Sequence, residues 1–350
     1  MPTSPPAPTL EAVAALAGVS RSTVSRVVNA SPRVTPDVIA AVNAAIEQLN
    51  YVPNRAARSL ASRRTLTIAL VIPENTAKFF ADPYFASVIQ GVAMYLSTTD
   101  YTLTLLIASE ADPEKTRRYL QGGNVDGALI LSHHSDDRSY VQLASALPVV
   151  FGGRPTGQTG STTYIVDVDN TAAAETATRY LIDHGRTRIA TIAGPQDMSA
   201  GIDRLEGWRK AIAAAAGAES VEAGAVEAGP IEAGPIEYTD FSPNGGAEAM
   251  ERLLASGAKF DALFAASAQI ASGALGVLRD HGLTVPGDVA IATIDNDYYA
   301  QNSTPALTTI EQPTTEQGGK IAETLVRLIA GEDVDRLTIM PTRLIERESV

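Results

Sequence analysis

Seven short apolar runs, separated by stretches with helical periodicity, constrain the fold of this chain more than any other feature. The runs do not alternate polar and apolar residues, which is typical of parallel strands buried on both faces. The stretches between them often end in glycine, as helices do. From residue 66 onward the pattern predicts an α/β body of two parallel-sheet subdomains. The runs are LTIALVIP, YTLTLLIAS, VDGALILS, LPVVFGG, RIATIAGP, FDALFAAS and DVAIATIDN.

Composition and the N-terminus narrow the class of protein. The 350 residues include no cysteine, which excludes disulfides and thiolate metal sites and suits a reducing compartment. The opening MPTSPPAPT has neither the basic start nor the apolar core of a signal peptide. No apolar run approaches the ~20 residues that span a bilayer. We therefore expect a cytoplasmic protein without membrane contact, whose residues 1–8 are disordered.

The charge of the chain is divided unevenly. Residues 1–65 hold seven arginines against three carboxylates, although the whole chain has a formal net charge of −13. A small basic head on an acidic body indicates that the head meets a polyanion and the body does not. Chance asymmetry of a solvated surface is the alternative that charge alone leaves open.

The basic head has the pattern of three short all-α elements. Thr9 can cap a first helix that Gly18 ends, and Ser20 can cap a second. Thr35 and Pro36 begin a third. Apolar residues recur at helical spacing in all three and predict one small core. These residues are Leu10, Val13, Ala14 and Ala17, then Val24, Val27 and Val28, then Val38, Ile39, Val42, Ala45, Ile46 and Leu49.

The second helix carries a polar stripe opposite its valines. Arginine can bind guanine edges bidentately, while serine, threonine and asparagine reach phosphates or other base edges. A helix, a short glycine turn and a polar-striped helix make the helix-turn-helix arrangement, whose second helix lies in the major groove. A solvated amphipathic helix is the alternative, and the basic balance of the head favours DNA. The stripe comprises Arg21, Ser22, Ser25, Arg26 and Asn29.

A short segment after the third helix has good helix formers but only one large apolar residue, Leu60. Residues 54–62 are too few to form a stable helix alone, because isolated helices are marginal below ~12–15 residues. DNA can support such a segment when arginines face phosphates and an apolar side chain wedges into the minor groove. An ordinary linker is the alternative.

The first 65 residues resemble the DNA-binding head of the lactose-repressor (LacI/GalR) family, through TLEAVAALAGVSRSTVSRVVNASPRVTPDVIAAVNAAIEQLNYVPNRAARSLASRRT. The resemblance implies a bacterial protein at the nucleoid, with a helix-turn-helix domain over residues 9–52 and a hinge helix or linker over 53–65. It implies that a homodimer binds a palindromic double-stranded DNA operator, that Arg21, Ser22 and Arg26 read bases, and that the hinge leucine inserts at the operator centre. The DNA-binding residues implied are Ser20, Arg21, Ser22, Thr23, Ser25, Arg26, Asn29, Asn54, Arg55, Arg58 and Leu60.

The body is similar to the periplasmic-sugar-binding-like core of the same family, through DPYFASVIQGV, DRLEGWRKAI and IATIDNDYYAQNSTPALTTIEQP. This implies an effector-binding core over 66–350. One subdomain would comprise 66–167 with 314–339, and the other 168–313 with 340–350, with one exchange near Gln312–Thr314. Ligands of such sheets bind beyond the carboxyl ends of the strands. Those ends hold Glu74, Ser109, His133, His134, Arg154, Ser267 and Asp295.

The resemblance also implies residues that bind a small-molecule effector, most simply a sugar or oligosaccharide. Tyr84 and Phe85 would line the cleft, Arg204 would contact hydroxyls, Asp295 would accept hydrogen bonds and Phe241 would stack on the ligand. Aromatic rings cover the apolar face of a sugar, while charged groups bind its hydroxyls. Simple core packing, a salt bridge and a helix cap are the alternative roles of these side chains.

Several features depart from the family pattern. Ser267 and Ala268 stand where the family commonly has an Asn-Asp pair, which removes two polar contacts to a sugar. The first loop, IPENTAKFFADPYF, is longer than usual, and SHHS brings His133 and His134 near the cleft. These changes leave the sugar class open. The five-residue repeat over Val221–Glu237 is expected to be a solvated insertion.

These observations predict a transcriptional regulator, a repressor that its effector releases, with co-repression as the alternative. A solute-binding protein without a DNA role is a second candidate. We expect no enzyme activity, cofactor or metal, because the chain has no GxSxG, HExxH or P-loop motif. His184 and His281 precede glycines at helix ends, which favours capping over catalysis. The family's leucine-rich tetramer tail is not found after the core, so we expect a dimer.

Overall fold

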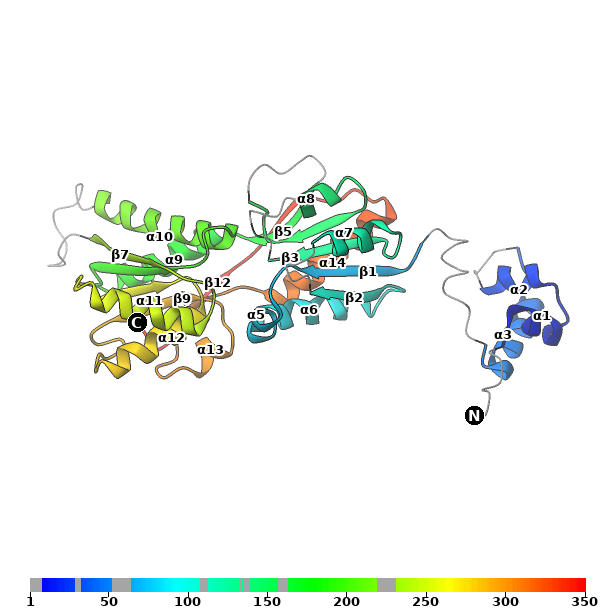
Figure 1. Ribbon diagram of the computed structural model, residues 1–350, viewed down its shortest axis with the longest axis horizontal. Coiled ribbons are helices and arrows are strands. Elements are labelled where there is room, and N and C mark those ends of the chain that lie inside the picture. Colours follow the sequence, from blue (N-terminus) through cyan, green and yellow to red (C-terminus); the bar gives the residue numbers. More distant parts are fainter. Residues whose placement is uncertain are drawn as a thin grey trace. The chain divides into compact units, whose positions relative to one another are not determined.

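The computed structural model describes residues 8–28, 33–51, 64–107, 113–132, 134, 139–156, 163–218 and 231–350. Its contacts divide the chain into two units, Met1–Leu66 and Thr67–Val350 (Figure 1). The predicted disordered tail, apart from Pro8, and the predicted hinge helix up to residue 63 lie outside the described residues. In the described part, no helix is both long and apolar enough to cross a membrane.

The first unit contains the three predicted helices, and local capping explains where they begin and end. Thr9 accepts a hydrogen bond from the Ala12 amide, and Gly18 ends the first helix with φ of 66°. Ser20 Oγ accepts from the Thr23 amide at 3.2 Å. The helices are α1 (Leu10–Ala17), α2 (Arg21–Val28) and α3 (Pro36–Leu49).

One small core holds these helices together. Val13, Val24 and Val42, one from each helix, have no exposed surface. The prediction that Ile39 faces this core is wrong, because 37% of its surface is exposed. Ile39 does not pack in the core, where α3 contributes Val38, Val42, Ala45, Ile46 and Leu49.

The second unit contains two six-stranded sheets, and the fold class is the predicted α/β arrangement. All seven predicted apolar runs form strands that pair in parallel. The first sheet has the order β11-β5-β4-β3-β1-β2 and the second β12-β10-β9-β8-β6-β7. In the first are β1 (Thr67–Ile72), β2 (Thr102–Ile107), β3 (Gly127–Leu131), β4 (Val149–Gly152), β5 (Tyr164–Val168) and β11 (Leu337–Met340). In the second are β6 (Arg188–Ala193), β7 (Glu232–Tyr238), β8 (Ala262–Ala265), β9 (Ala290–Ile294), β10 (Thr308–Glu311) and β12 (Arg343–Ile345).

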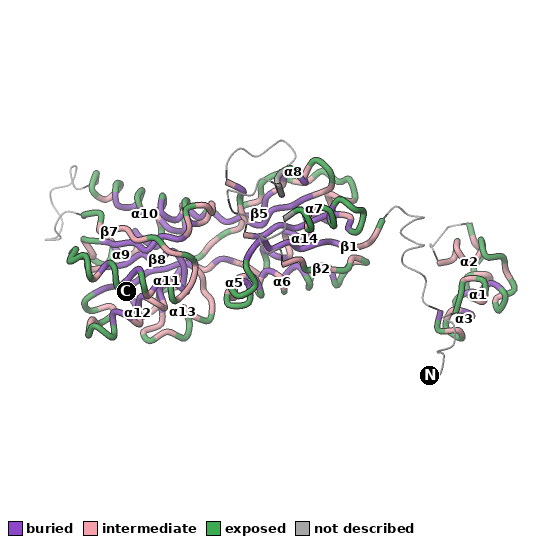
Figure 2. The backbone as a smooth tube through the Cα atoms, viewed as in Figure 1, coloured by how far each residue is buried: buried purple, intermediate pink, exposed green. Residues whose placement is uncertain are grey.

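Helices cover both faces of each sheet, which leaves the inner strands buried in the middle layer (Figure 2). The edge strands β2, β11, β7 and β12 are partly exposed. Against the first sheet lie α5 (Thr76–Ala81), α6 (Pro83–Leu96), α7 (Pro113–Gln121), α8 (Ser139–Leu143) and α14 (Thr314–Ala330). Against the second lie α9 (Asn170–Asp183), α10 (Ser199–Ala218), α11 (Pro243–Ala255), α12 (Ala268–Asp280) and α13 (Tyr298–Asn302).

The chain passes between the two sheets three times in the described part: after β5, after β10 and after β11. The second passage runs through Gln312 and Pro313 into α14, which packs on α6 beside the first sheet. The long first loop forms α5. His184 and His281 cap α9 and α12, as predicted, and each ring lies within hydrogen-bond distance of a carbonyl one turn earlier.

The five-residue repeat is only partly as predicted. Residues 219–230 lie outside the described residues, but Glu232–Tyr238 forms β7, an edge strand paired with β6. The prediction of a solvated insertion is therefore wrong for this part of the repeat. Ile231 and Ile236 pack against the core of the second sheet, because every fifth residue of the repeat is a β-branched apolar side chain.

Candidate functional site

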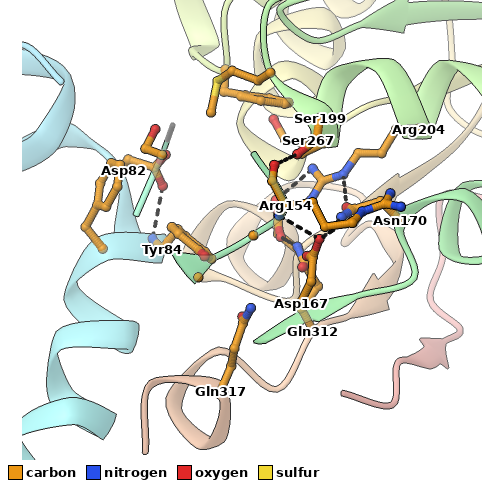
Figure 3. Close-up of a pocket in the computed structure, with 18 of the residues that line it drawn as sticks. Asp82, Tyr84, Arg154, Asp167, Asn170, Ser199, Arg204, Ser267, Gln312 and Gln317 are labelled. Atoms are coloured by element: carbon orange, nitrogen blue, oxygen red, sulfur yellow. Dashed lines mark hydrogen bonds and ion pairs between the residues drawn. The ribbon is translucent and has the colours of Figure 1, made fainter. Parts of the chain in front are cut away.

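A pocket lies where the carboxyl ends of both sheets meet, and it encloses about 100 Å³ (Figure 3). Six residues expected to bind an effector line it together: Tyr84, Phe85, Arg204, Phe241, Ser267 and Asp295. His133 lies outside the described residues. The pocket also has lining residues that were not singled out from the sequence, namely Asp82, Asp167, Asn170, Gln269, Gln312 and Gln317.

The N-terminus of α6 places the two aromatic residues of the first wall. Asp82 caps the helix by accepting from the Tyr84 amide at 3.0 Å. Phe85 is 2% exposed and belongs to the core under the first sheet, so it both supports the core and lines the pocket. Burial, together with the nearby carboxylates of Asp167 and Asp295, raises the pKa of Tyr84. Tyr84 is therefore a neutral phenol that can donate or accept a hydrogen bond.

Arg204 is the central cation of the second wall. It is 6% exposed, and its Nε donates to Asn170 Oδ1 at 2.9 Å while Nη1 donates to the Ala266 carbonyl at 2.7 Å. Its guanidinium lies 5.5 Å from the centre of the Phe241 ring, a favourable cation–π distance. Oδ2 of Asp295 lies 3.8 Å from Nη1 of Arg204. Several groups therefore hold the guanidinium in place, so its role is not limited to a salt bridge with Asp295.

Asp295 follows β9 in the left-handed region, with φ of 82°. Gln312 Nε2 donates to one of its carboxylate oxygens. Asp297, not Asp295, caps α13, which excludes the helix-cap alternative for Asp295. Burial and the charge of Asp295 raise the pKa of Asp297 to about 7, and burial raises that of Asp82 to about 6. Asp82 on the first wall and Asp297 on the second therefore hold their protons more strongly than ordinary carboxyls, and Asp297 is partly neutral near pH 7.

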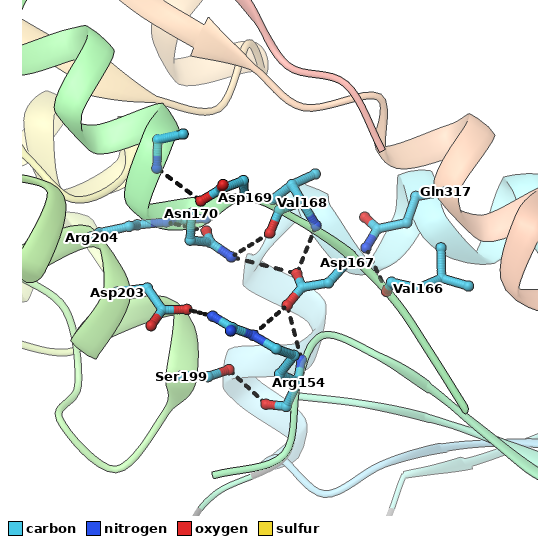
Figure 4. Close-up of polar contacts among 11 residues, drawn as sticks. Arg154, Val166, Asp167, Val168, Asp169, Asn170, Ser199, Asp203, Arg204 and Gln317 are labelled. Atoms are coloured by element: carbon cyan, nitrogen blue, oxygen red, sulfur yellow. Dashed lines mark hydrogen bonds and ion pairs between the residues drawn. The ribbon is translucent and has the colours of Figure 1, made fainter. Parts of the chain in front are cut away.

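Asp167 is the centre of a second polar network, at the first passage between the sheets (Figure 4). It is 3% exposed and accepts from the amides of Arg154 at 3.0 Å and Val168 at 2.8 Å. The Arg154 side chain forms an ion pair with Asp203 on α10, and Ser199 Oγ donates to the Arg154 carbonyl. These contacts join the end of β4 in the first sheet to α10 beside the second.

His134 makes a further contact across the cleft. Its Nδ1 lies 2.7 Å from Asp197, which follows β6, and its Nε2 lies 3.1 Å from Glu74, which follows β1. Hydrogen bonding to Glu74, and then to Asp197, raises the pKa of His134 to about 9. Burial alone would raise the pKa of Glu74, but hydrogen bonds from His134, Lys78 and Ser132 lower it to about 2. The imidazolium is therefore held between two carboxylates.

We expect the stability of the second unit to fall as His134 loses its proton. The folded-state pKa of about 9 lies above the ordinary 6.5, so the stabilisation is complete below pH 6.5 and disappears as the pH rises through 9. His134→Gln removes this charge. Between about pH 7 and pH 10 the wild-type protein should lose roughly 2 kcal/mol more free energy of unfolding than the variant. Urea unfolding measures the difference, His281→Gln is the control, and equal losses in wild type and His134→Gln would contradict the prediction.

The polar stripe of α2 is the candidate nucleic-acid interface of the first unit. Arg21, Ser22 and Arg26 are exposed, and Thr23 and Ser25 are partly so. The Ser20 hydroxyl lies 2.8 Å from those of both Ser22 and Thr23, which connects three of the predicted contact residues. Asn29 and the hinge residues Asn54, Arg55, Arg58 and Leu60 lie outside the described residues.

The sequence did not point to an ion pair between Arg21 Nε and Glu11, 3.2 Å apart and well exposed. Glu11 is on α1 and Arg21 on α2, so only their three-dimensional packing brings them together. Exposed pairs of this kind contribute little stability. Arg21 can therefore separate from Glu11 at small cost in free energy.

Both units match known families. Residues 9–54 match the family described as bacterial regulatory proteins, lacI family, and residues 178–350 match the periplasmic binding protein-like domain. The HTH-type transcriptional regulator CelR of Thermobifida fusca is 44% identical over 345 residues, covering 98% of each chain. The ribose operon repressor of Escherichia coli K12 is 34% identical, covering 97% of this chain and 99% of the repressor.

Solved structures agree with these matches. A CelR–cellobiose complex superposes with a TM-score of 0.74 at 42% identity, covering 98% of this chain and 100% of that one. The lac repressor dimer bound to its operator superposes with a TM-score of 0.82 at 24% identity, covering 98% of each chain, which supports the fold alone. The relatives of this chain are transcriptional regulators with a helix-turn-helix head and an effector-binding core. This chain is a DNA-binding member of the LacI family.

Proposed function

We propose that this protein is a cytoplasmic repressor that binds a palindromic operator as a homodimer and is released by cellobiose or a closely related glucose oligosaccharide. The proposed effector rests on one observation, the pocket in which aromatic side chains lie near Arg204 and Asp295. Such a combination suits a ligand with apolar ring faces and many hydroxyls. The extensive similarity to a regulator solved with cellobiose supports this choice among sugars.

The described conformation is closed more tightly than a disaccharide allows. The pocket encloses about 100 Å³, against ~300–1,000 Å³ for typical ligand sites. Two cross-cleft contacts, Arg154–Asp203 and His134–Asp197, hold its walls together. We infer that ligand entry rotates residues 66–167 and 314–339 against residues 168–313 and 340–350. Operator affinity then changes only as far as the ligand prefers one arrangement over the other.

We assign DNA recognition to the helix-turn-helix domain at residues 9–52 and to the hinge at 53–65. Ser20, Thr23 and Ser25 would position α2 on phosphates, while Arg21, Ser22 and Arg26 would read base edges. The exposed position of the two arginines and the linked hydroxyls at the start of α2 support these roles.

The test combines calorimetry with operator binding. Duplexes selected by the protein from a random pool provide the operator, and fluorescence anisotropy follows its release as cellobiose, lactose, maltose or ribose is added. We expect cellobiose to bind, to release the operator and to be recovered unchanged. Tighter operator binding would indicate a co-repressor, and hydrolysis would indicate an enzyme. Sugar binding without any selected duplex would favour a solute-binding protein.

A further inference from the structure

The pocket contains a buried acceptor that the protein leaves unpaired. Five buried side-chain polar atoms in the described part have no hydrogen-bond partner. Four belong to Thr156, Thr163, Thr178 and Trp208, none of which lines the pocket. The fifth is Oε1 of Gln317, a pocket-lining residue that is only 2% exposed. Unpaired buried acceptors are costly, so a group that completes this one is to be expected.

Chemistry fixes the orientation of the Gln317 amide. Its Nε2 donates to the Val166 carbonyl at 3.2 Å (Figure 4). Turning the amide over would place two oxygens face to face, because a carbonyl can only accept. Oε1 therefore stays on the side away from Val166, and the side chain rises from the start of α14 toward the pocket (Figure 3).

The backbone around Gln317 cannot withdraw to find another partner. The first turns of α14 lie directly on α6, where neither Gly318 nor Gly91 has space for a Cβ. The carbonyl of Val88 blocks the first position and that of Thr315 blocks the second. Since α6 also carries Tyr84 and Phe85, this close contact holds all three side chains in one rigid wall of the pocket.

We propose that Gln317 Oε1 accepts a hydrogen bond from a hydroxyl of the bound sugar and thereby determines which ligands the pocket takes. This inference rests on the proposed sugar effector and adds a contact from the first-sheet wall. Arg204 and Asp295 lie on the second-sheet wall, so one ligand would bond to both walls. A ligand without a donor at this position leaves the acceptor unpaired, and sites of this kind discriminate strongly against such analogues.

The test uses Gln317→Leu, which is similar in size but has no acceptor. We expect the dissociation constant for cellobiose to rise about tenfold, ~1.4 kcal/mol. The melting temperature of the ligand-free variant should not fall, because an unpaired polar group is removed and the Val166 carbonyl still accepts from the Gly153 amide at 3.0 Å. A purely structural glutamine would give the opposite result, a lower melting temperature with unchanged affinity.

A set of monodeoxy cellobioses identifies the hydroxyl. Against the wild-type protein, one member of the set should bind about tenfold more weakly because it lacks the donor for Gln317. Against Gln317→Leu, the same member should bind as well as cellobiose itself. Gln142→Leu, an exposed change outside the pocket, is the control and should bind every sugar as the wild type does.

Two outcomes would overturn the inference in different ways. If Gln317→Leu and the wild type bind cellobiose and all its deoxy forms equally, Gln317 does not contact the ligand, while the proposed effector stands. If the wild-type protein binds no cellobiose but still binds its selected operator, both the proposed effector and this contact to it are wrong.

Discussion

Replacing Arg21 and Arg26 together by alanine is expected to weaken operator binding about a thousandfold. A bidentate contact from arginine to a base contributes ~1–3 kcal/mol of discrimination, and both side chains project from the exposed face of α2. The dependence of affinity on salt should also become shallower, because fewer counterions are released on binding. Anisotropy titrations with the selected duplex at several salt concentrations measure both effects. The fold of the head should be unchanged, since the core valines lie on the opposite face.

Arg209→Ala with Lys210→Ala is the matched control for this double variant. Both residues are exposed on α10 in the second unit, and the change in net charge is the same. We expect its operator affinity to stay within about twofold of the wild type. An unchanged affinity of the Arg21→Ala, Arg26→Ala protein for all duplexes would contradict the assignment of α2 as the reading helix.

Replacing Arg204 by methionine is expected to abolish the response to effector while operator binding persists. The guanidinium is the buried cation beside Asp295, and losing the hydrogen bonds of such a charged group to the sugar costs ~1.5–3 kcal/mol. Affinity for cellobiose should therefore fall by up to about a hundredfold. Asn170 and the Ala266 carbonyl also lose a donor, so the melting temperature should fall as well. Calorimetry and effector-induced release of operator measure the two losses.

Two further variants separate charge and shape at this position. Arg204→Lys keeps the positive charge but lacks the rigid planar fork that bonds to Asn170 and Ala266, so we expect an intermediate affinity. Arg209→Met, an exposed change on the same helix, should leave effector binding unchanged. Wild-type affinity in Arg204→Met would show that the ligand does not use this guanidinium.

The fold was predictable where buried elements have a clear hydrophobic pattern in the sequence. Six of the seven predicted strands are continuous apolar runs because helices cover both faces of each sheet, and β2 lies at a sheet edge. The strands that were missed carry weaker signals. β5 contains the buried Asp167, and β11 exposes Leu337 and Ile339 at a sheet edge. β7 has a composition, EAGPIEY, that local propensity assigns to a loop.

The residues of the site were predictable only where they belong to a recognisable sequence motif. Family resemblance points to Tyr84, Arg204, Phe241 and Asp295, and all four line one pocket. Their ligand roles stay predictions. Gln317 was missed because its burial depends on packing between α6 and α14, which are far apart in the sequence. No local pattern separates a buried glutamine with an unpaired Oε1 from an exposed glutamine.

Strand β7 has a consequence for how this protein tolerates length variation. Gly234 lies so close to the backbone of Ile189 and Ala190 that a Cβ would not fit, and the repeat supplies a glycine at every fifth position. The units VEAGP and IEAGP are nearly interchangeable. If one five-residue unit were lost or duplicated, the residues that pair with β6 would therefore have almost the same sequence as before. We therefore expect the second sheet to keep its architecture when this segment changes in length by whole repeat units.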